Sequence, residues 1–350
     1  MEYIALKNIC KINMGQSPDS SSYNDNKDGI PFFQGNADFG EKYPVTRVWC
    51  NAPIKVAQPN DILISVRAPI GALNFAKEEC CIGRGLAALT PDRSKVSLEF
   101  IYWVLKWKKA ELNSKGTGST FKAISRKVLE ETLVPAIDFE KQYEYAEILG
   151  KTYSVIKKYK KELNCLDGLI KARFVEMFYD KGYPILKWND VFNTTTGKLD
   201  SNAAVEDGEY PFFTCSKEVL RIDKFAFDQE ALLLAGNNAA GKYDVKYYNG
   251  KFNAYQRTYV LGLKEDWSYQ LFRYQLEDKL VYLQQQSLGG LTKYLTMKIL
   301  GKLDFIIPPI EKQIAFEVFA NQVNKSKVAV QKALDETQML FDSLMQEYFN

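Results

Sequence analysis

The chain has 350 residues, of which 46% are hydrophobic and 25% charged, so it can form about two or three folded domains and leaves little room for disorder. It contains no histidine, which excludes Ser/His/Asp and Cys/His triads, histidine-based zinc sites and every other mechanism that needs an imidazole. The net charge of +3 is compatible with nucleic-acid binding but does not decide it.

The six cysteines are predicted to be reduced thiols. No two of them have Cys-x-x-Cys spacing, and the adjacent Cys80 and Cys81 make a poor disulfide framework. The first ten residues, MEYIALKNIC, contain no apolar run of signal-peptide length, and no stretch approaches the roughly 18 apolar residues of a membrane span. We therefore expect a cytoplasmic chain that does not contact a membrane.

The sequence contains an internal repeat. Three pairs of segments match in the same order along the chain: Asp28–Phe33 with Asp207–Phe213, Asp61–Gly71 with Ala231–Gly241, and Gly118–Gln142 with Gly289–Gln313. The same alignment pairs Arg84 with Arg257 and Lys122 with Lys293. Repetition in a fixed order over such a length predicts two related halves.

Residues 1–139 are predicted to form a domain of mixed α and β structure. Ile62–Val66 has the apolar and β-branched composition of a strand, whereas Leu98–Leu105 has apolar residues at helical spacing. The run Gln16–Asp28 is rich in Ser, Asn and Asp, which predicts an exposed loop.

Residues 140–180 are predicted to form one long helix, because apolar residues from Ile156 to Met177 recur every three or four positions. A helix of about 35–40 residues is roughly 50–60 Å long at 1.5 Å per residue. This length exceeds the width of a small domain.

Residues 184–310 are predicted to repeat the mixed domain. They contain a strand-like segment at Thr258–Leu261, a helical segment at Tyr269–Leu276 and a polar loop at Thr194–Asp207, the counterpart of the loop in the first half. Loops of this kind commonly carry function.

Residues 311–350 are predicted to form a second long helix, with a seam from Phe319 to Tyr348 that includes Leu340. In the order domain, helix, domain, helix, the compact solution has the second helix antiparallel to the first, with a domain at each end, like a dumbbell. The predicted fold class is therefore α+β, with two pseudo-symmetric domains joined by two long antiparallel helices that form a coiled-coil-like spacer.

Catalysis by this chain alone is not expected. Asp19 and Asp25, followed by Lys27, have the loose spacing of a metal-dependent nuclease, but they lie in a polar loop with no counterpart in the second half. We expect a plain loop there, and no catalytic residue, metal site or cofactor.

DNA binding fits the residues better. Arg and Lys can neutralise phosphates or pair with guanine edges, and Asn and Gln can pair with adenine edges. A single such residue is more often a solvated surface side chain, so the repeated positions carry the argument. The candidate DNA-binding residues are Gln16, Ser17, Gln34, Asn36, Arg67, Arg84, Lys122, Arg126, Thr195, Lys198, Asn237, Asn238, Lys242, Gln256, Arg257 and Lys293.

Three segments resemble the specificity subunits of type I restriction-modification systems: DILISVRAPIG (Asp61–Gly71), CIGRGLAAL (Cys81–Leu89) and GSTFKAISRKVLEETLVPAIDFEKQ (Gly118–Gln142). The resemblance spans the whole chain. It implies two target-recognition domains, 1–139 and 184–310, each recognising one half of a bipartite site on double-stranded DNA, and two helices that set the gap.

The resemblance also implies that this chain is not an enzyme. Methylation and cleavage would belong to separate partners, namely two methyltransferase (modification) subunits and the restriction or translocase subunits, which this chain positions on DNA.

Two departures from the family pattern matter. In the second half, Ala235–Gly241 (AGNNAAG) stands where the first half has the RAPIG motif, as expected if the halves recognise different DNA sequences. The chain is also short for the family, which keeps open a related type II methyltransferase-nuclease system.

Two other classes of function stay open, a coiled-coil adaptor that does not bind DNA and an autonomous nuclease. Loss of affinity with salt would support phosphate contact, and metal-dependent cleavage by the purified chain would support the nuclease.

Overall fold

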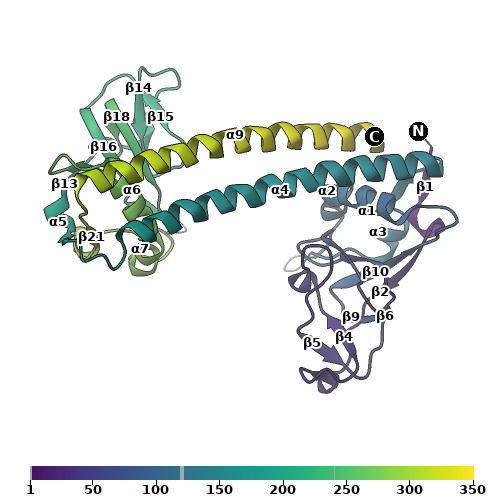
Figure 1. The fold of residues 1–350 in the computed structure, drawn as a ribbon. Coiled ribbons are helices and arrows are strands. Elements are labelled where there is room, and N and C mark those ends of the chain that lie inside the picture. Colours follow the sequence, from purple (N-terminus) through teal and green to yellow (C-terminus); the bar gives the residue numbers. More distant parts are fainter. Residues whose placement is uncertain (1, 119–121, 240) are drawn as a thin grey trace. The chain divides into compact units, whose positions relative to one another are not determined.

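The computed structural model describes residues 2–118, 122–239 and 241–350 (Figure 1). The chain divides into two compact units, of which the first is Met1–Lys161 with Lys332–Asn350 and the second is Glu162–Gln331. Each unit contains one globular domain and a part of each of two 40-residue helices, α4 (Phe139–Phe178) and α9 (Ile310–Phe349). The predicted α+β class with two long helices is confirmed.

In its described residues, the globular domain of the first unit contains three sheets and three short α-helices. The sheets are β1 (Tyr3–Ala5) with β11 (Leu133–Pro135); β2 (Cys10–Met14), β10 (Leu86–Pro91), β7 (Ile62–Ser65) and β8 (Leu73–Phe75) in that order; and β3 (Tyr23–Asn24), β5 (Val48–Cys50), β4 (Ile30–Phe33), β9 (Cys80–Ile82) and β6 (Val56–Ala57) in that order. The helices are α1 (Leu98–Trp107), α2 (Lys109–Ser114) and α3 (Arg126–Glu130), with 3-10 turns η1 (Leu6–Asn8), η2 (Ser20–Ser22) and η3 (Asn36–Asp38).

The domain of the second unit is also built of three sheets and short helices in the described residues, but most of its strands join in one six-stranded sheet. Its sheets are β12 (Ile185–Lys187) with β21 (Asp304–Ile306); β13 (Phe192–Thr196), β19 (Thr258–Leu263), β16 (Phe227–Ala235), β18 (Val245–Ala254), β14 (Tyr210–Phe213) and β15 (Leu220–Ile222) in that order; and β17 (Asn237–Asn238) with β20 (Lys293–Tyr294). The helices are α5 (Trp188–Val191), α6 (Tyr269–Asp278), α7 (Leu280–Gln286) and α8 (Met297–Leu300), with the 3-10 turn η4 (Ser201–Ala203).

The strand pairings confirm the internal repeat. In each domain the first strand pairs antiparallel with the last one before the long helix, β1 with β11 and β12 with β21. The Phe-Phe strand of each domain pairs in parallel with a later strand, β4 with β9 and β14 with β18. Within the repeat, the predicted strands at Ile62–Val66 and Thr258–Leu261 lie in β7 and β19, and the predicted short helices lie in α1 and α6.

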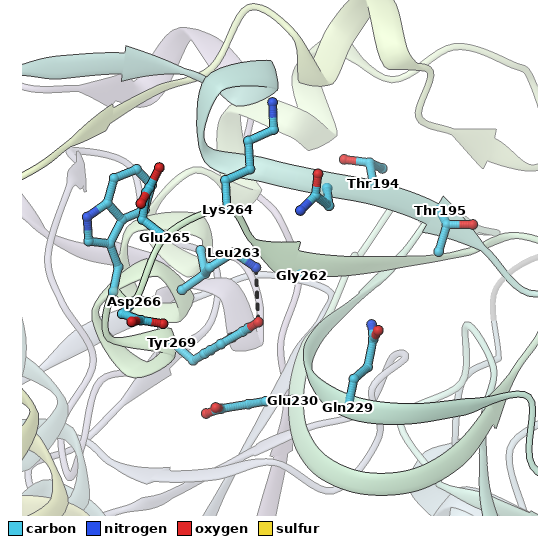
Figure 2. A pocket seen from close by; sticks show the side chains of 12 residues that line it. Thr194, Thr195, Gln229, Glu230, Gly262, Leu263, Lys264, Glu265, Asp266 and Tyr269 are labelled. Atoms are coloured by element: carbon cyan, nitrogen blue, oxygen red, sulfur yellow. Dashed lines mark hydrogen bonds between the residues drawn. The ribbon is translucent and has the colours of Figure 1, made fainter.

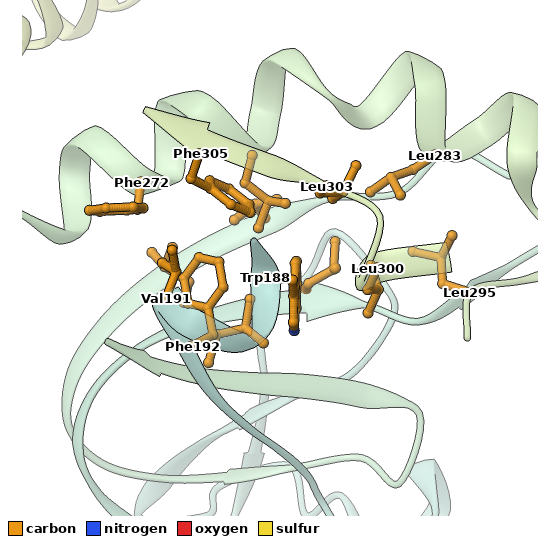
Figure 3. Close-up of a cluster of buried hydrophobic side chains, with 14 of the residues drawn as sticks. Trp188, Val191, Phe192, Phe272, Leu283, Leu295, Leu300, Leu303 and Phe305 are labelled. Carbon is orange, nitrogen blue, oxygen red and sulfur yellow. The ribbon is translucent and has the colours of Figure 1, made fainter. Parts of the chain in front are cut away.

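Aromatic side chains fill the core of the second domain (Figure 3). Trp188 and Phe192 face Phe305 of β21, and the rings of Phe192 and Phe305 lie 5.1 Å apart, nearly perpendicular. The indole Nε1 of Trp188 donates a hydrogen bond to the hydroxyl of Thr194 at 2.9 Å, so the largest core residue leaves no polar atom unpaired. This core fixes β13 against β21 and so holds the loop after β13 in place.

The long helices pack antiparallel within each unit, because contact partners run in opposite directions along α4 and α9. The pairs are Tyr145 with Tyr348 and Tyr153 with Phe341 in the first unit, and Asp167 with Lys327 and Phe174 with Phe316 in the second. Among the helices of the described residues, none is both long enough and apolar enough to cross a bilayer.

The predicted seam of the second long helix is wrong at Leu340, whereas Tyr348 at its end is buried. Leu340 is 54% exposed, and its neighbour Phe341 is buried at 5%. A straight α-helix has 3.6 residues per turn and drifts by about 20° per heptad against a strict seven-residue repeat, which moves the buried position along by one residue.

A buried glutamine joins each long helix to a short helix of its own domain. Gln142 in the first turn of α4 accepts a hydrogen bond from the backbone N–H of Ser97 at 2.8 Å and donates one to the carbonyl of Ile137 at 2.9 Å. Ser97 is the N-cap of α1. The second unit repeats the arrangement, since the Gln313 amide accepts from the N–H of Ser268, the N-cap of α6, at 3.0 Å.

We predict that Gln142→Ala destabilises the first unit by about 1–3 kcal/mol, because it leaves a buried N–H and a partly buried carbonyl without partners. Gln313→Ala should act on the second unit in the same way. Urea unfolding gives the size, and hydrogen exchange at the start of α1 or α6 gives the location. Gln346→Ala, at an exposed position on α9, is the matched control, and an equal loss in the control would contradict the prediction.

Candidate nucleic-acid interface

Four of the predicted residues of the first domain meet where three backbone segments come together. The Ser17 hydroxyl and the Gln34 side-chain amide lie within hydrogen-bond distance through both amide atoms, at 3.0 and 3.1 Å. The backbone N–H of Arg84 donates to the same hydroxyl at 3.3 Å, and the N–H of Gln16 donates to the carbonyl of Ile82 at 3.0 Å. We call Gln16, Ser17, Gln34 and Arg84 the first polar cluster.

Arg67 and Lys122 lie beside this cluster. The N–H of Ala68 donates to the carbonyl of Lys122 at 3.1 Å, which ties the loop after β7 to the loop before α3. Two residues earlier, the N–H of Val66 donates to the carbonyl of Gly85 at 2.9 Å. The side chains of Arg67, Arg84 and Lys122 are exposed, so three cations share one edge of the domain. Ser119, Thr120 and Phe121 of the GSTFKAIS segment lie outside the described residues.

Asn36 and Arg126 are not part of the first polar cluster. Asn36 is the first residue of η3, directly after the segment that holds Gln34. Arg126 opens α3 and pairs with Glu130 at 2.7 Å, so a carboxylate already balances its charge. The structure therefore places Asn36 near the first polar cluster and gives Arg126 a local role in its helix.

The second domain builds an equivalent surface from different side chains. Asn237 and Asn238 form β17 and pair with Tyr294 and Lys293 of β20, as the segment around Arg67 pairs with Ala123 in the first domain. The backbone N–H of Lys242 donates to the Asn238 side chain at 3.3 Å. This edge thus brings together Asn237, Asn238, Lys242 and Lys293.

Lys198, Gln256 and Arg257 complete that surface. The N–H of Gln256 donates to the carbonyl of Leu199, the residue after Lys198, at 2.9 Å. The carbonyl of Arg257 accepts from the N–H of Gly236, directly before β17, at 2.8 Å. We call Lys198, Gln256 and Arg257 the second polar cluster.

Thr195 lines an open pocket of about 780 Å³ on the second domain, together with Glu230, Glu265 and Asp266 (Figure 2). The hydroxyl of Tyr269 closes one side of the pocket by accepting a hydrogen bond from the N–H of Leu263 at 3.0 Å. The lining also includes Lys264, but three carboxylates leave it negatively charged, which disfavours a phosphate backbone there. A DNA contact by Thr195 stays a prediction.

The alignment of Arg84 with Arg257 is wrong by one residue. The carbonyl of Gly85 accepts from Val66, and the carbonyl of Arg257 accepts from Gly236, in the same place of the repeat. Arg257 is therefore the counterpart of Gly85, and Gln256 is the counterpart of Arg84. A long side chain stands where the first half has a glycine, so matching by residue type aligns the two arginines and misses the offset.

Asp200 is a residue of this surface that sequence reasoning missed. Its carboxylate caps η4 and also accepts a hydrogen bond from the Nε2 of Gln256 at 3.2 Å. The available signal was its place in the loop corresponding to that of Asp19, which caps η2 in the first domain.

Of the two carboxylates considered for a nuclease, Asp19 has a local partner. Asp19 accepts a hydrogen bond from the N–H of Ser21 at 2.9 Å, and this bond lowers the pKa of its carboxyl group. Within residues 2–118, 122–239 and 241–350, no three Cys, Asp or Glu side chains are grouped to hold a metal ion. The loop carries an N-cap where the nuclease hypothesis needs a ligand.

Burial controls the chemistry of the cysteines. It raises the pKa of the Cys10, Cys80 and Cys81 thiols to about 12, because a buried thiolate loses its hydration. Cys165, on α4, is exposed, and Cys215 is partly exposed. The raised pKa makes Cys10, Cys80 and Cys81 poor nucleophiles.

The comparison with known families agrees with this geometry. The profile of the type I restriction modification DNA specificity domain matches residues 1–165 and 181–334. The two matched regions each contain one copy of the repeat. This chain belongs to that family.

Individual relatives match parts of the chain. A protein of Methanocaldococcus jannaschii described as a type I restriction enzyme MjaX specificity subunit is 44% identical over 152 residues, which cover 43% of this chain and 36% of the relative. The type I restriction enzyme EcoDI specificity subunit of Escherichia coli is 52% identical over 87 residues, covering 24% and 19%. The matched part is thus about a third or less of these relatives.

One solved structure has the same fold. The S subunit of a type I restriction-modification system from M. genitalium superposes with a TM-score of 0.66 and 15% identity, covering 100% of this chain and 96% of that one. At this identity the likeness concerns the fold alone.

We predict that iodoacetamide at pH 8 labels Cys165 fastest and Cys215 more slowly. Cys10, Cys80 and Cys81 should react only after unfolding, because a thiol with a pKa of about 12 is almost entirely protonated at pH 8. Peptide mapping by mass spectrometry after timed labelling measures each site. Rapid labelling of Cys80 or Cys81 in the folded protein would contradict the prediction.

Proposed function

We propose that this chain is the DNA-recognition subunit of a type I restriction-modification complex. In this proposal each globular domain binds one half of a bipartite site on double-stranded DNA. The observation that carries it is the recurrence, in both domains, of an exposed polar edge on the same backbone frame but with different side chains. A shared frame with changed side chains is what two domains need if they recognise different base sequences.

The chemistry of the two edges supports DNA as the ligand. Arg67, Arg84 and Lys122 offer cations on the first domain, and cations bind phosphates while releasing counterions. The second edge combines the amides of Asn237 and Asn238 with Lys242 and Lys293, and amides pair well with adenine edges. Phosphate contacts position a protein on DNA, and amide or guanidinium contacts with bases add specificity.

We further propose that residues 1–139 and 184–310 are the recognition domains and that residues 140–180 and 311–350 are the spacer that sets the gap between half-sites. Methylation and cleavage then belong to two modification subunits and to restriction or translocase subunits. Exposed apolar side chains on α9, such as Ile314 at 52% and Val318 at 64%, provide a surface for such partners.

The spacer proposal predicts that the gap follows the length of the helices. Seven residues added to α4 after Lys161 and seven added to α9 after Gln331 keep the heptad phase and lengthen the spacer by about 10 Å. We expect the unspecified gap to grow by about three base pairs, at 3.4 Å each, while both half-sites stay the same. The measurement is modification-sensitive sequencing of DNA from a host that expresses the chain with its modification subunits.

A matched control adds the same seven residues to α4 only, which disturbs the antiparallel pairing and should abolish methylation. A continuous methylated motif, or a gap unaffected by the paired insertions, would contradict the spacer proposal. Absence of any methylated motif with the unmodified chain would favour the coiled-coil adaptor.

Phosphate contact by Lys122 and Lys293 predicts a measurable change in salt dependence. Lys122→Ala and Lys293→Ala should each weaken binding of the assembled complex to all sequences and flatten the plot of log affinity against log salt by about 0.9 per lost contact. Lys95→Ala is the control, since Lys95 pairs with Asp92 at the far end of β10. Unchanged slopes in both variants would remove these lysines from the interface.

A further inference from the structure

The two polar clusters share a tight turn. In the first domain the N–H of Leu86 donates to the carbonyl of Gly83 at 3.0 Å, and in the second the N–H of Thr258 donates to Tyr255 at 2.8 Å. Each turn is also tied to the Phe-Phe strand of its domain, since the N–H of Gly83 donates to Phe33 at 2.8 Å and the N–H of Tyr255 to Phe213 at 2.9 Å. The second residue of each turn, Arg84 or Gln256, is exposed at its tip.

Close packing holds the first turn in place. A Cβ atom at Gly85 would lie 2.4 Å from the backbone carbonyl oxygen of Gln34, so this position needs glycine. A Cβ atom at Gly83 would lie 2.5 Å from Oε1 of Gln34, the end of a side chain that would have to move. Arg84 thus projects from a rigid backbone, between two residues without side chains. Within the described part of the chain, no residue pairs with its guanidinium group.

The second turn presents an oriented amide in the same place. Gln256 donates one Nε2 hydrogen to Asp200 at 3.2 Å, which leaves its second Nε2 hydrogen and its Oε1 available to a ligand. Because Gln is neutral, this turn position cannot serve mainly to neutralise phosphate. The feature common to both domains is a planar, hydrogen-bonding end group on a fixed turn.

We propose that Arg84 and Gln256 occupy equivalent specificity-determining positions, at which Arg84 recognises a guanine in the first half-site and Gln256 an adenine in the second. The inference rests on the proposed DNA-recognition function and deepens it. A guanidinium donates two hydrogen bonds to O6 and N7 of guanine, and a side-chain amide accepts from N6 and donates to N7 of adenine. A fixed turn favours such contacts because its backbone loses little freedom on binding, and the bond to Asp200 also restrains the Gln256 side chain.

The test exchanges the two end groups in the intact complex with its modification subunits. Arg84→Gln should change one guanine of the first half-site to adenine, and Gln256→Arg should change one adenine of the second half-site to guanine. We expect a change in preference of about tenfold or more at that base pair. Each variant should leave the other half-site and the gap unchanged, as measured by modification-sensitive sequencing.

Matched controls place the same changes elsewhere on the same domains. Arg93→Gln follows β10, at the opposite end of that strand from Arg84, and Gln229→Arg lies near the start of β16, whereas the Gly236 contact with Arg257 follows its end. Both control positions are exposed, and both controls should keep the original motif. Arg84→Lys should keep the guanine with weaker discrimination, because Lys also donates to O6 and N7.

The outcomes separate the two proposals. If a variant keeps the original motif and methylates all sites equally less, the residue contacts the DNA backbone. That result overturns the inference, while the proposed DNA recognition stands. If a variant methylates nothing, binding of its complex to duplexes with each base pair at that position decides, and an unchanged preference overturns the inference. No bipartite motif with the unmodified chain overturns the proposed function and this inference together.

Discussion

The placement of each globular domain on its long helix depends on one buried side-chain amide. Gln142 and Gln313 bind the backbone N–H of an N-cap serine, and each serine hydroxyl in turn accepts from the N–H three residues on, within a short helix of the domain. The first turn of the long helix and the start of the short helix therefore share one hydrogen-bond network. A buried network of this kind permits one arrangement, because any other leaves polar groups unpaired away from water. The polar edges of the domains inherit their position from it.

The two copies of the repeat keep the same backbone hydrogen bonds but differ in their surface side chains. Backbone hydrogen bonds at the turn tips and the Glu-Lys-Gln ends recur, whereas exposed residues differ, with Arg67 in one copy against Asn237 in the other. Buried hydrogen bonds tolerate little change, since a lost partner costs about 1–3 kcal/mol, but an exposed side chain can change at almost no cost in stability. Two copies on one frame can therefore acquire different partners for their exposed residues without refolding.

Sequence reasoning succeeds where a pattern is long and fails where one residue decides. The repeat, the long helices and the strands at Ile62 and Thr258 follow from periodicity and composition. The helix seam is wrong at Leu340 because the true helical period accumulates an offset. The counterpart of Arg84 is wrong because only the backbone hydrogen bonds show that Gln256, and not its neighbour Arg257, takes the same place in the repeat. Asp200 is absent from the sequence-based candidates, because its contact with Gln256 joins residues far apart in the chain.

Both edges carry cations, but the proposed base contact differs in charge between the two domains. The first edge carries Arg67, Arg84 and Lys122, so the phosphate term and the proposed base contact both come from cations there. At the tip of the second turn the amide of Gln256, oriented by Asp200, takes the place of a cation. Salt weakens binding by cations but affects a neutral amide contact much less. In the proposed function Lys198, Lys242, Arg257 and Lys293 would supply the phosphate contacts of the second domain, so only the base contact would change from a charged to a neutral group. Two copies of one backbone arrangement can in this way recognise the two halves of an asymmetric DNA site.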